Sequence, residues 1–310
     1  MLEKLLTLQK RIHECYLDDC SDASWMDWYS TAKTAPRLYF MQRGDWIDIT
    51  FYTNCADEDF NMRKSEDLFE EKDLSYPFVA FCELLSQQEI ADKIISLRFE
   101  AADEGANGTK EWNFKRLVDS GVIFPNLRSF SVGLTNPTDH NTAIMVSGDR
   151  SEPFDEGGII ARLVSVMPEL RSLTVPSAPN KSFFELGPLK LTELIIQAGY
   201  DRQNFIENLA DCDSNHFPDL LLIDYSDYRY VFDHVAGTET PFESYKKLFL
   251  SPLFRQERLS FWLRDSILTG PQLSALVTIS KQSRGLNGEA VPFEHITSRC
   301  KYVEEGQFKY

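Results

Sequence analysis

Two stretches of the chain carry the same pattern and decide the fold that we predict: Phe124-Pro-Asn-Leu-Arg-Ser-Phe-Ser-Val132 and Met167-Pro-Glu-Leu-Arg-Ser-Leu-Thr-Val175. The second stretch keeps every apolar position of the first at an offset of 43 residues. The apolar residues follow the spacing L-x-x-L-x-L, whose last positions alternate as side chains do along a β-strand. The proline before the first leucine ends a preceding helix. The pattern therefore predicts a short strand with one buried face.

Weaker copies of this pattern occur on both sides of the two strong ones. They run over residues 94–99, 191–196 and 220–225, with a partial copy at 259–261 and a candidate earlier copy at 46–51. Between the copies, apolar residues at helical spacing predict crossovers at 114–118, 159–166, 205–209 and 245–250. Strands that alternate with crossovers in this way predict a parallel sheet assembled in chain order.

On these residues the chain resembles the leucine-rich-repeat superfamily over roughly residues 90 to 265, in the looser form of some bacterial cytosolic proteins. The resemblance implies an α/β fold, a right-handed open solenoid. It would have a parallel concave sheet of about six or seven short strands, with helical or irregular crossovers on the convex side. The steps between corner positions are 33, 43, 21 and 29 residues, whereas regular family members step by about 20 to 29. The Asn or Cys that normally follows the strand is absent.

We predict three regions in one elongated unit. Residues 1–92 form an acidic N-terminal cap, and whether this cap includes a first irregular repeat stays open. Residues 93–269 form the solenoid, and residues 270–310 form the C-terminal cap. Solenoid ends need caps because a terminal repeat would otherwise leave its inner face in water. In the first cap we expect an amphipathic helix over residues 1–20, with an apolar face of Leu2, Leu5, Leu6, Ile12 and Tyr16. Residues 142–146 predict an extra strand, interpreted as a hairpin arm.

Charge excludes two classes of partner. The 310 residues include 32 Lys and Arg and 48 Asp and Glu, a net charge of −16, and residues 1–92 hold 19 of the acids against 9 bases. Nucleic acids and anionic membranes are bound largely by Lys and Arg that neutralise phosphate, so we expect neither as a partner. The scattered cysteines, the charged N-terminal stretch and the lack of a long apolar run predict a cytoplasmic protein with reduced thiols.

The sequence contains no motif that predicts catalysis or a bound cofactor. No two of the five histidines are four residues apart, and no complete phosphate loop or G-x-S-x-G elbow occurs. Acidic pairs such as Asp57 with Asp59 or Asp211 with Asp213 are more often solvated surface than a divalent-ion site. We therefore predict a chain that is not an enzyme and holds no cofactor or metal.

Strand alternation predicts which side chains the concave face offers to a partner. The candidate partner-binding residues are Arg98, Glu100, Glu193, Gln197, Asp224, Tyr228, Trp262 and Arg264. Trp and Arg are enriched among binding hot spots, and Tyr228 belongs to a tyrosine-rich turn that we expect after the fourth strand. The alternative is that the apolar members of this face, Ile195, Leu222 and Trp262, are covered by the hairpin arm or a loop.

Three functions remain in order of preference. The first is a non-enzymatic protein–protein interaction module that uses the concave face. The second narrows the first to an acidic inhibitor or immunity-type protein that neutralises a basic toxin or nuclease, because an acidic field speeds association with a cationic partner. The third is a metal-assisted hydrolase or transferase with acidic residues at the edge of the repeat. The partner's identity and the oligomeric state stay open.

Overall fold

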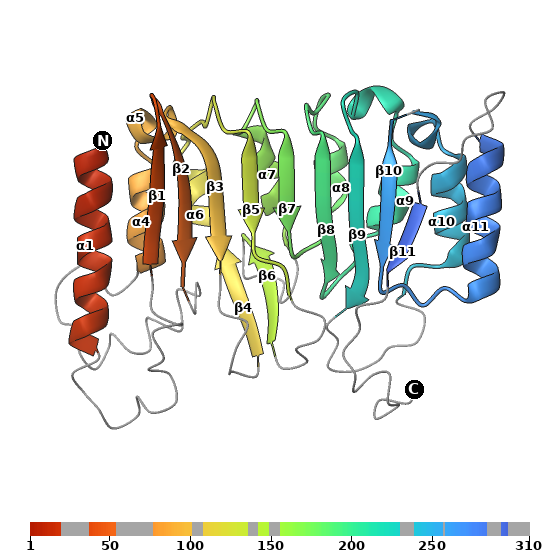
Figure 1. Ribbon diagram of the computed structural model, residues 1–310, viewed down its shortest axis with the longest axis horizontal. Helices are drawn as coiled ribbons and strands as arrows, with labels where there is room; N and C mark the ends of the chain where they lie inside the picture. The colour runs from red at the N-terminus through yellow and green to blue at the C-terminus, as the bar shows by residue number, and fades with distance from the viewer. Residues whose placement is uncertain are drawn as a thin grey trace.

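The chain forms a mixed α/β fold with one large, mostly parallel sheet (Figure 1). The computed structural model describes residues 1–19, 37–53, 77–100, 108–135, 142–148, 156–229, 239–256, 258–283 and 293–296. Within these residues nine strands pair in the order β1-β2-β3-β5-β7-β8-β9-β10-β11, and β4 and β6 form a separate pair. The large sheet is open, with β1 at one edge and β11 at the other.

The strands of the large sheet follow one another in chain order. They are β1 (Arg37–Arg43), β2 (Trp46–Tyr52), β3 (Ile94–Glu100), β5 (Ser129–Val132), β7 (Ser172–Val175), β8 (Glu193–Gly199), β9 (Leu222–Arg229), β10 (Ser260–Arg264) and β11 (Phe293–Ile296). Neighbours pair in parallel, except that β1 and β2 form an antiparallel hairpin. All the predicted copies of the repeat therefore form strands of one sheet, which β1 and β11 extend beyond the six or seven strands expected.

Helices connect successive strands, and α1 precedes the first strand. They are α1 (Leu2–Asp19), α4 (Pro77–Leu85), α5 (Gln88–Ala91), α6 (Lys115–Asp119), α7 (Ile159–Ser165), α8 (Lys181–Phe184), α9 (Phe205–Ala210), α10 (Phe242–Leu250) and α11 (Gly270–Ser283), with short 3-10 turns η1 (Ser214–His216) and η2 (Leu253–Arg255). The four predicted crossovers are confirmed as α6, α7, α9 and α10. Helices α4 and α6 to α9 lie behind the sheet in Figure 1, with α1 beyond β1 and α11 at the opposite end.

The core lies between the sheet and the helices. One row of inward side chains crosses seven strands in register and is buried throughout: Ile49, Leu97, Phe130, Leu173, Leu194, Ile223 and Phe261. The corner leucines Leu127, Leu170, Leu191 and Leu220 are buried as well. Burying one such side chain contributes about 1.5–3 kcal/mol. The period-two alternation read from the sequence thus assigns the core face of each strand correctly.

The buried face of α1 differs from the one predicted. Leu5, Leu8 and Ile12 are buried, whereas Leu2 and Leu6 are 38% and 49% exposed. Residues three and four apart share a helix face, so Leu5, Leu8 and Ile12 point the same way while Leu6 lies about a quarter turn away. The side chain of Tyr16 lies outside the described residues.

The predicted hairpin arm is wrong, although the strand itself is confirmed. β6 (Thr142–Ser147) pairs in parallel with β4 (Gly108–Asn113), which the sequence did not predict. Parallel strands cannot be joined by a tight hairpin turn. β4 follows β3 in the chain and β6 follows β5, so two successive steps each add one strand to a second small sheet (Figure 1). This explains why those two steps, 33 and 43 residues, are the longest of the four.

Two further features correct or limit the predictions. The tyrosine-rich segment expected to be a turn belongs to β9 up to Arg229, with Tyr225 buried in the core.

Residues 57–73 and the chain beyond residue 296, both part of the predicted caps, lie outside the described residues. Among the described helices, none is both long enough and apolar enough to cross a membrane.

Candidate functional site

The face of the large sheet that points away from α4 and α6 to α9 is called the open face here, and in Figure 1 no described helix lies over it. Strand register places one side chain from each strand in a continuous row along this face. The row consists of Tyr39, Thr50, Arg98, Ser131, Thr174, Ile195, Asp224, Trp262 and Glu294. Except for Asp224, each of these residues is partly or fully exposed. The open face is therefore a continuous surface that spans all nine strands and is accessible to a partner.

The N-terminal end of the open face is aromatic and cationic. Tyr39 and Met41 on β1 are 52% and 59% exposed. The guanidinium carbon of Arg37 lies 5.8 Å from the centre of the Tyr52 ring, and its Nη1 donates to the Tyr39 hydroxyl at 3.4 Å. Arginine over an aromatic ring is attracted by the electron-rich face of the ring. Cations thus line this end, although residues 1–92 as a whole are acidic.

Small hydroxyl side chains occupy the middle of the open face. Ser96, Ser129 and Ser172 are in register on β3, β5 and β7, and Ser131 and Thr174 form the next row. All five are partly exposed. Short side chains leave the sheet surface low, so the main chain of a partner can approach it closely, and hydroxyls can both donate and accept hydrogen bonds.

An ion pair fixes the C-terminal end of the open face. Arg264 on β10 donates to Asp224 on β9 through both Nε–Oδ1, at 2.6 Å, and Nη2–Oδ2, at 2.8 Å. The Asp224 side chain is 9% exposed and that of Arg264 is 32% exposed. The hydrogen bonds to the carboxylate raise the pKa of Arg264. Such a two-pronged pair holds both side chains in one geometry.

Apolar side chains surround this ion pair. Trp262 and Ile195 flank Asp224 in register from the two neighbouring strands, and the Arg264 guanidinium lies 5.9 Å from the centre of the Trp262 ring. Ile195, Leu222 and Trp262 each keep part of their surface accessible. We call these three residues, together with Asp224 and Arg264, the Trp262 cluster. It combines apolar area with an oriented charged group, the composition of a binding hot spot.

The other predicted site residues lie in different surroundings. Arg98 and Glu100 have side chains that are 57% and 37% exposed, with Nη1 and Oε1 separated by 3.6 Å. Glu193 is exposed at the start of β8 and accepts a hydrogen bond from the Ser172 hydroxyl at 3.1 Å. Tyr228 belongs to β9, but its side chain lies outside the described residues.

Gln197, which we predicted among the partner-binding residues, is not accessible on the open face. Gln197 is only 6% exposed. Its Oε1 accepts from the backbone N–H of Thr135 at 2.8 Å, and its Nε2 donates to the backbone carbonyl of Thr135 at 2.8 Å. The segment that follows β5 therefore passes the end of β7 and closes over β8. The alternation of side chains along the strand predicted correctly on which side of the sheet Gln197 lies, but it did not predict the segment that covers Gln197.

A buried polar network on the helix side of β9 was not predicted. The Asp227 carboxylate accepts from the Tyr225 hydroxyl at 3.2 Å, the Thr240 hydroxyl at 2.7 Å and the Tyr245 hydroxyl at 2.9 Å. Burial raises the pKa of Asp227 and places those of Tyr225 and Tyr245 well above their usual value. The only cue in the sequence is an acid at an inward strand position. The network ties β9 to α10 and has no access to the open face.

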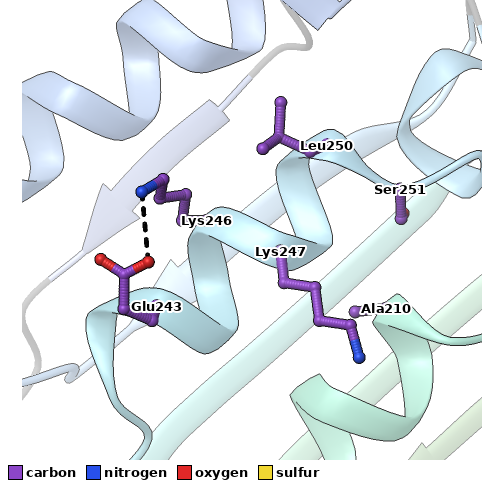
Figure 2. A pocket seen from close by; sticks show the side chains of 6 residues that line it. All are labelled: Ala210, Glu243, Lys246, Lys247, Leu250 and Ser251. Atoms are coloured by element: carbon purple, nitrogen blue, oxygen red, sulfur yellow. Dashed lines mark hydrogen bonds and ion pairs between the residues drawn. The ribbon is translucent and has the colours of Figure 1, made fainter.

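A shallow depression of about 430 Å³ lies on the helix side, between α9 and α10 (Figure 2). Two lysines line it, but each pairs with a carboxylate: Lys246 with Glu243 at 3.2 Å, and Lys247 with Asp211 at 2.5 Å. The depression therefore presents no unneutralised charge to a ligand. In the described part of the chain, no group of three or more His, Cys, Asp or Glu side chains is arranged to hold a metal ion.

Comparison with protein-family models, with curated proteins and with solved structures finds no match for this chain. The open face spans all nine strands of the large sheet and carries exposed or partly exposed aromatic side chains at both ends.

Proposed function

We propose that this chain is an interaction module of leucine-rich-repeat type that binds another protein on the open face of its sheet, without catalysing a reaction. The proposal extends to a right-handed open solenoid and to a cytoplasmic location. Two observations support the repeat: the strands pair in chain order, and the corner leucines and inward side chains occupy equivalent buried places on successive strands. Solenoids of this kind bind partners on extended sheet surfaces.

The observation that carries the binding proposal is the Trp262 cluster on a face that no described helix covers (Figure 1). On the strands from β2 to β10 of the large sheet, apolar side chains on the helix side are buried, whereas Ile195, Leu222 and Trp262 remain partly accessible on the open face. Exposed apolar area beside an oriented ion pair favours a protein partner, because burying that area would drive association while the charges select the partner.

Site-specific photo-crosslinking in the native cell tests this proposal. The photoreactive residue p-benzoylphenylalanine replaces Ser131 or Thr174, which are two positions in register on the open face. The matched control position is Lys181 on α8, whose side chain is 78% exposed on the helix side. We expect both open-face positions to crosslink the same protein and Lys181 not to do so.

A second measurement links the crosslink to the Trp262 cluster. We expect Trp262→Ala to reduce crosslinking from Thr174 at least fivefold, since a central aromatic contact contributes about 1–2 kcal/mol or more to binding. Leu250→Ala, which removes a 49% exposed side chain from α10, should leave it unchanged. If the partner crosslinks from Lys181 and not from the open face, the proposal is overturned.

A further inference from the structure

Two carboxylates beside the Trp262 cluster have no cationic partner among the described residues. Glu193 on β8 and Glu294 on β11 are both exposed. The only positive charge close to them in the cluster is Arg264, and both prongs of its guanidinium are held by Asp224. The ion pair cancels its own charge, so among the described side chains the two exposed carboxylates, Glu193 and Glu294, stay without a neutralising cation on either side of an apolar centre.

Strand register fixes how these charges are arranged. Glu294 lies directly beside Trp262, and Glu193 lies beside Leu222 on the other side of the cluster. β8 and β11 are separated by three strand spacings. With neighbouring strands about 4.8 Å apart and residues about 3.4 Å apart along each strand, the α-carbons of the two glutamates are about 16 Å from each other. The apolar side chains lie between them.

The opposite end of the open face has the reverse character. There Arg37 contacts aromatic groups, and the ammonium of Lys93 lies 5.9 Å from the centre of the Trp46 ring. Neither cation pairs with a carboxylate in the described part of the chain. Near β1 the carboxylates of Asp48 and Glu100 are each paired with an arginine, so among the described side chains the two ends differ: unpaired cations lie near β1, and unpaired carboxylates lie beside the Trp262 cluster.

We infer that the C-terminal half of the open face binds a protein segment with an apolar side chain between two cationic side chains, the cations facing Glu193 and Glu294. The inference rests on the proposed function and names the chemistry of its partner. The net charge of −16 on the whole chain acts in the same direction, since it attracts a cationic segment and speeds association. The same charge repels nucleic acid, which is why a protein segment is the occupant.

Peptide selection by phage display tests this inference directly. A library of random 16-residue peptides is selected on the full-length chain, after removal of all peptides that also bind the Trp262→Ala chain. We expect the retained peptides to carry Lys or Arg on both sides of an apolar residue. Against Glu193→Gln/Glu294→Gln, their affinity should fall about fivefold to tenfold, because two charge contacts at a partly exposed site are lost. Glu243→Gln on α10 is the matched control and should change nothing.

The possible outcomes distinguish a failure of the inference from a failure of the proposed function. Retained peptides that need Trp262 but are neutral or acidic would overturn the inference and leave the proposed function standing. No retained peptide at all would count against protein binding at this face, and the inference would fail with it. A 20-nucleotide single-stranded DNA that binds more tightly than the retained peptides would also overturn the inference.

Discussion

Arg264 and Asp224 lie on neighbouring strands and join through two parallel hydrogen bonds, of 2.6 Å and 2.8 Å, on the open face of the sheet. The pair connects β9 to β10 by side chains in addition to the backbone ladder. It also holds the guanidinium close to the Trp262 ring. The same contact therefore contributes to the stability of the sheet and to the shape of the candidate binding surface.

Removing the arginine of this pair should destabilise the protein. In Arg264→Ala, the Asp224 carboxylate, 9% exposed, would lose its charged partner, and we expect a loss of about 1–3 kcal/mol in the free energy of unfolding. Arg264→Lys should recover only part of this loss, because an ammonium cannot form the two-pronged contact. Urea denaturation followed by circular dichroism measures both changes. Lys247→Ala, which breaks an ion pair with side chains 54% and 66% exposed, should cost less than about 1 kcal/mol.

The Asp227 network predicts a dependence of stability on pH. Because burial raises the pKa of Asp227 above its ordinary value of 3.8, the folded state holds this proton more tightly than the unfolded state does. The resulting stabilisation is full below the ordinary pKa and is lost as pH rises through the folded pKa. The part of the decrease in unfolding free energy between pH 4 and pH 7 that is due to Asp227 should therefore be absent in Asp227→Asn. Identical pH profiles for the two proteins would contradict the prediction.

Asp227→Ala tests the structural role of the same carboxylate. Three buried hydroxyls, those of Tyr225, Thr240 and Tyr245, would lose their acceptor, and we expect a destabilisation of about 3 kcal/mol or more. Asp227→Asn keeps a hydrogen-bonding group of the same size and should cost less. Thermal denaturation of the two variants side by side measures the difference, and equal losses for both would contradict the prediction.

His216 should make the protein less stable in mild acid. Burial lowers the pKa of His216 below its ordinary value of 6.5, and its Nε2 is buried with no hydrogen-bond acceptor among the described residues. The unfolded state therefore binds this proton more readily. Stability should be full above pH 6.5 and fall as pH decreases toward the folded pKa. His216→Phe should reduce the fall in unfolding free energy between pH 7.5 and pH 5.5, and an unchanged fall would refute the assignment.

Cys212 should be chemically inert in the folded protein. Burial, followed by the nearby charges of Asp211 and Asp213, raises the pKa of its thiol to about 12. Since the thiolate is the reactive form, iodoacetamide at pH 8 should leave Cys212 unmodified in the native chain and modify it in guanidinium chloride. Mass spectrometry of the peptide that contains Cys212 reads out both states. Rapid modification of the native protein would show that this region opens.

The amino-acid sequence determined the strands that carry the repeat, from β2 to β10 of the large sheet, and the side of each that is buried. Leu127 and Leu170 are followed by alternating apolar residues, and alternation with period two depends only on local backbone geometry. The prolines and the helical spacing between copies likewise located four crossovers. These features are local, so they can be read without knowing what any segment contacts. The same alternation placed Trp262 on the open face.

Only the tertiary structure decided which segments meet. Parallel pairing of β4 with β6, and of β10 with β11, joins residues far apart in the chain, and no local pattern encodes such pairing. The burial of Gln197 depends on a segment that closes over it, and the capture of Arg264 by Asp224 depends on the register of two strands 40 residues apart. Periodicity states which way a side chain points, whereas its partners are set by long-range packing.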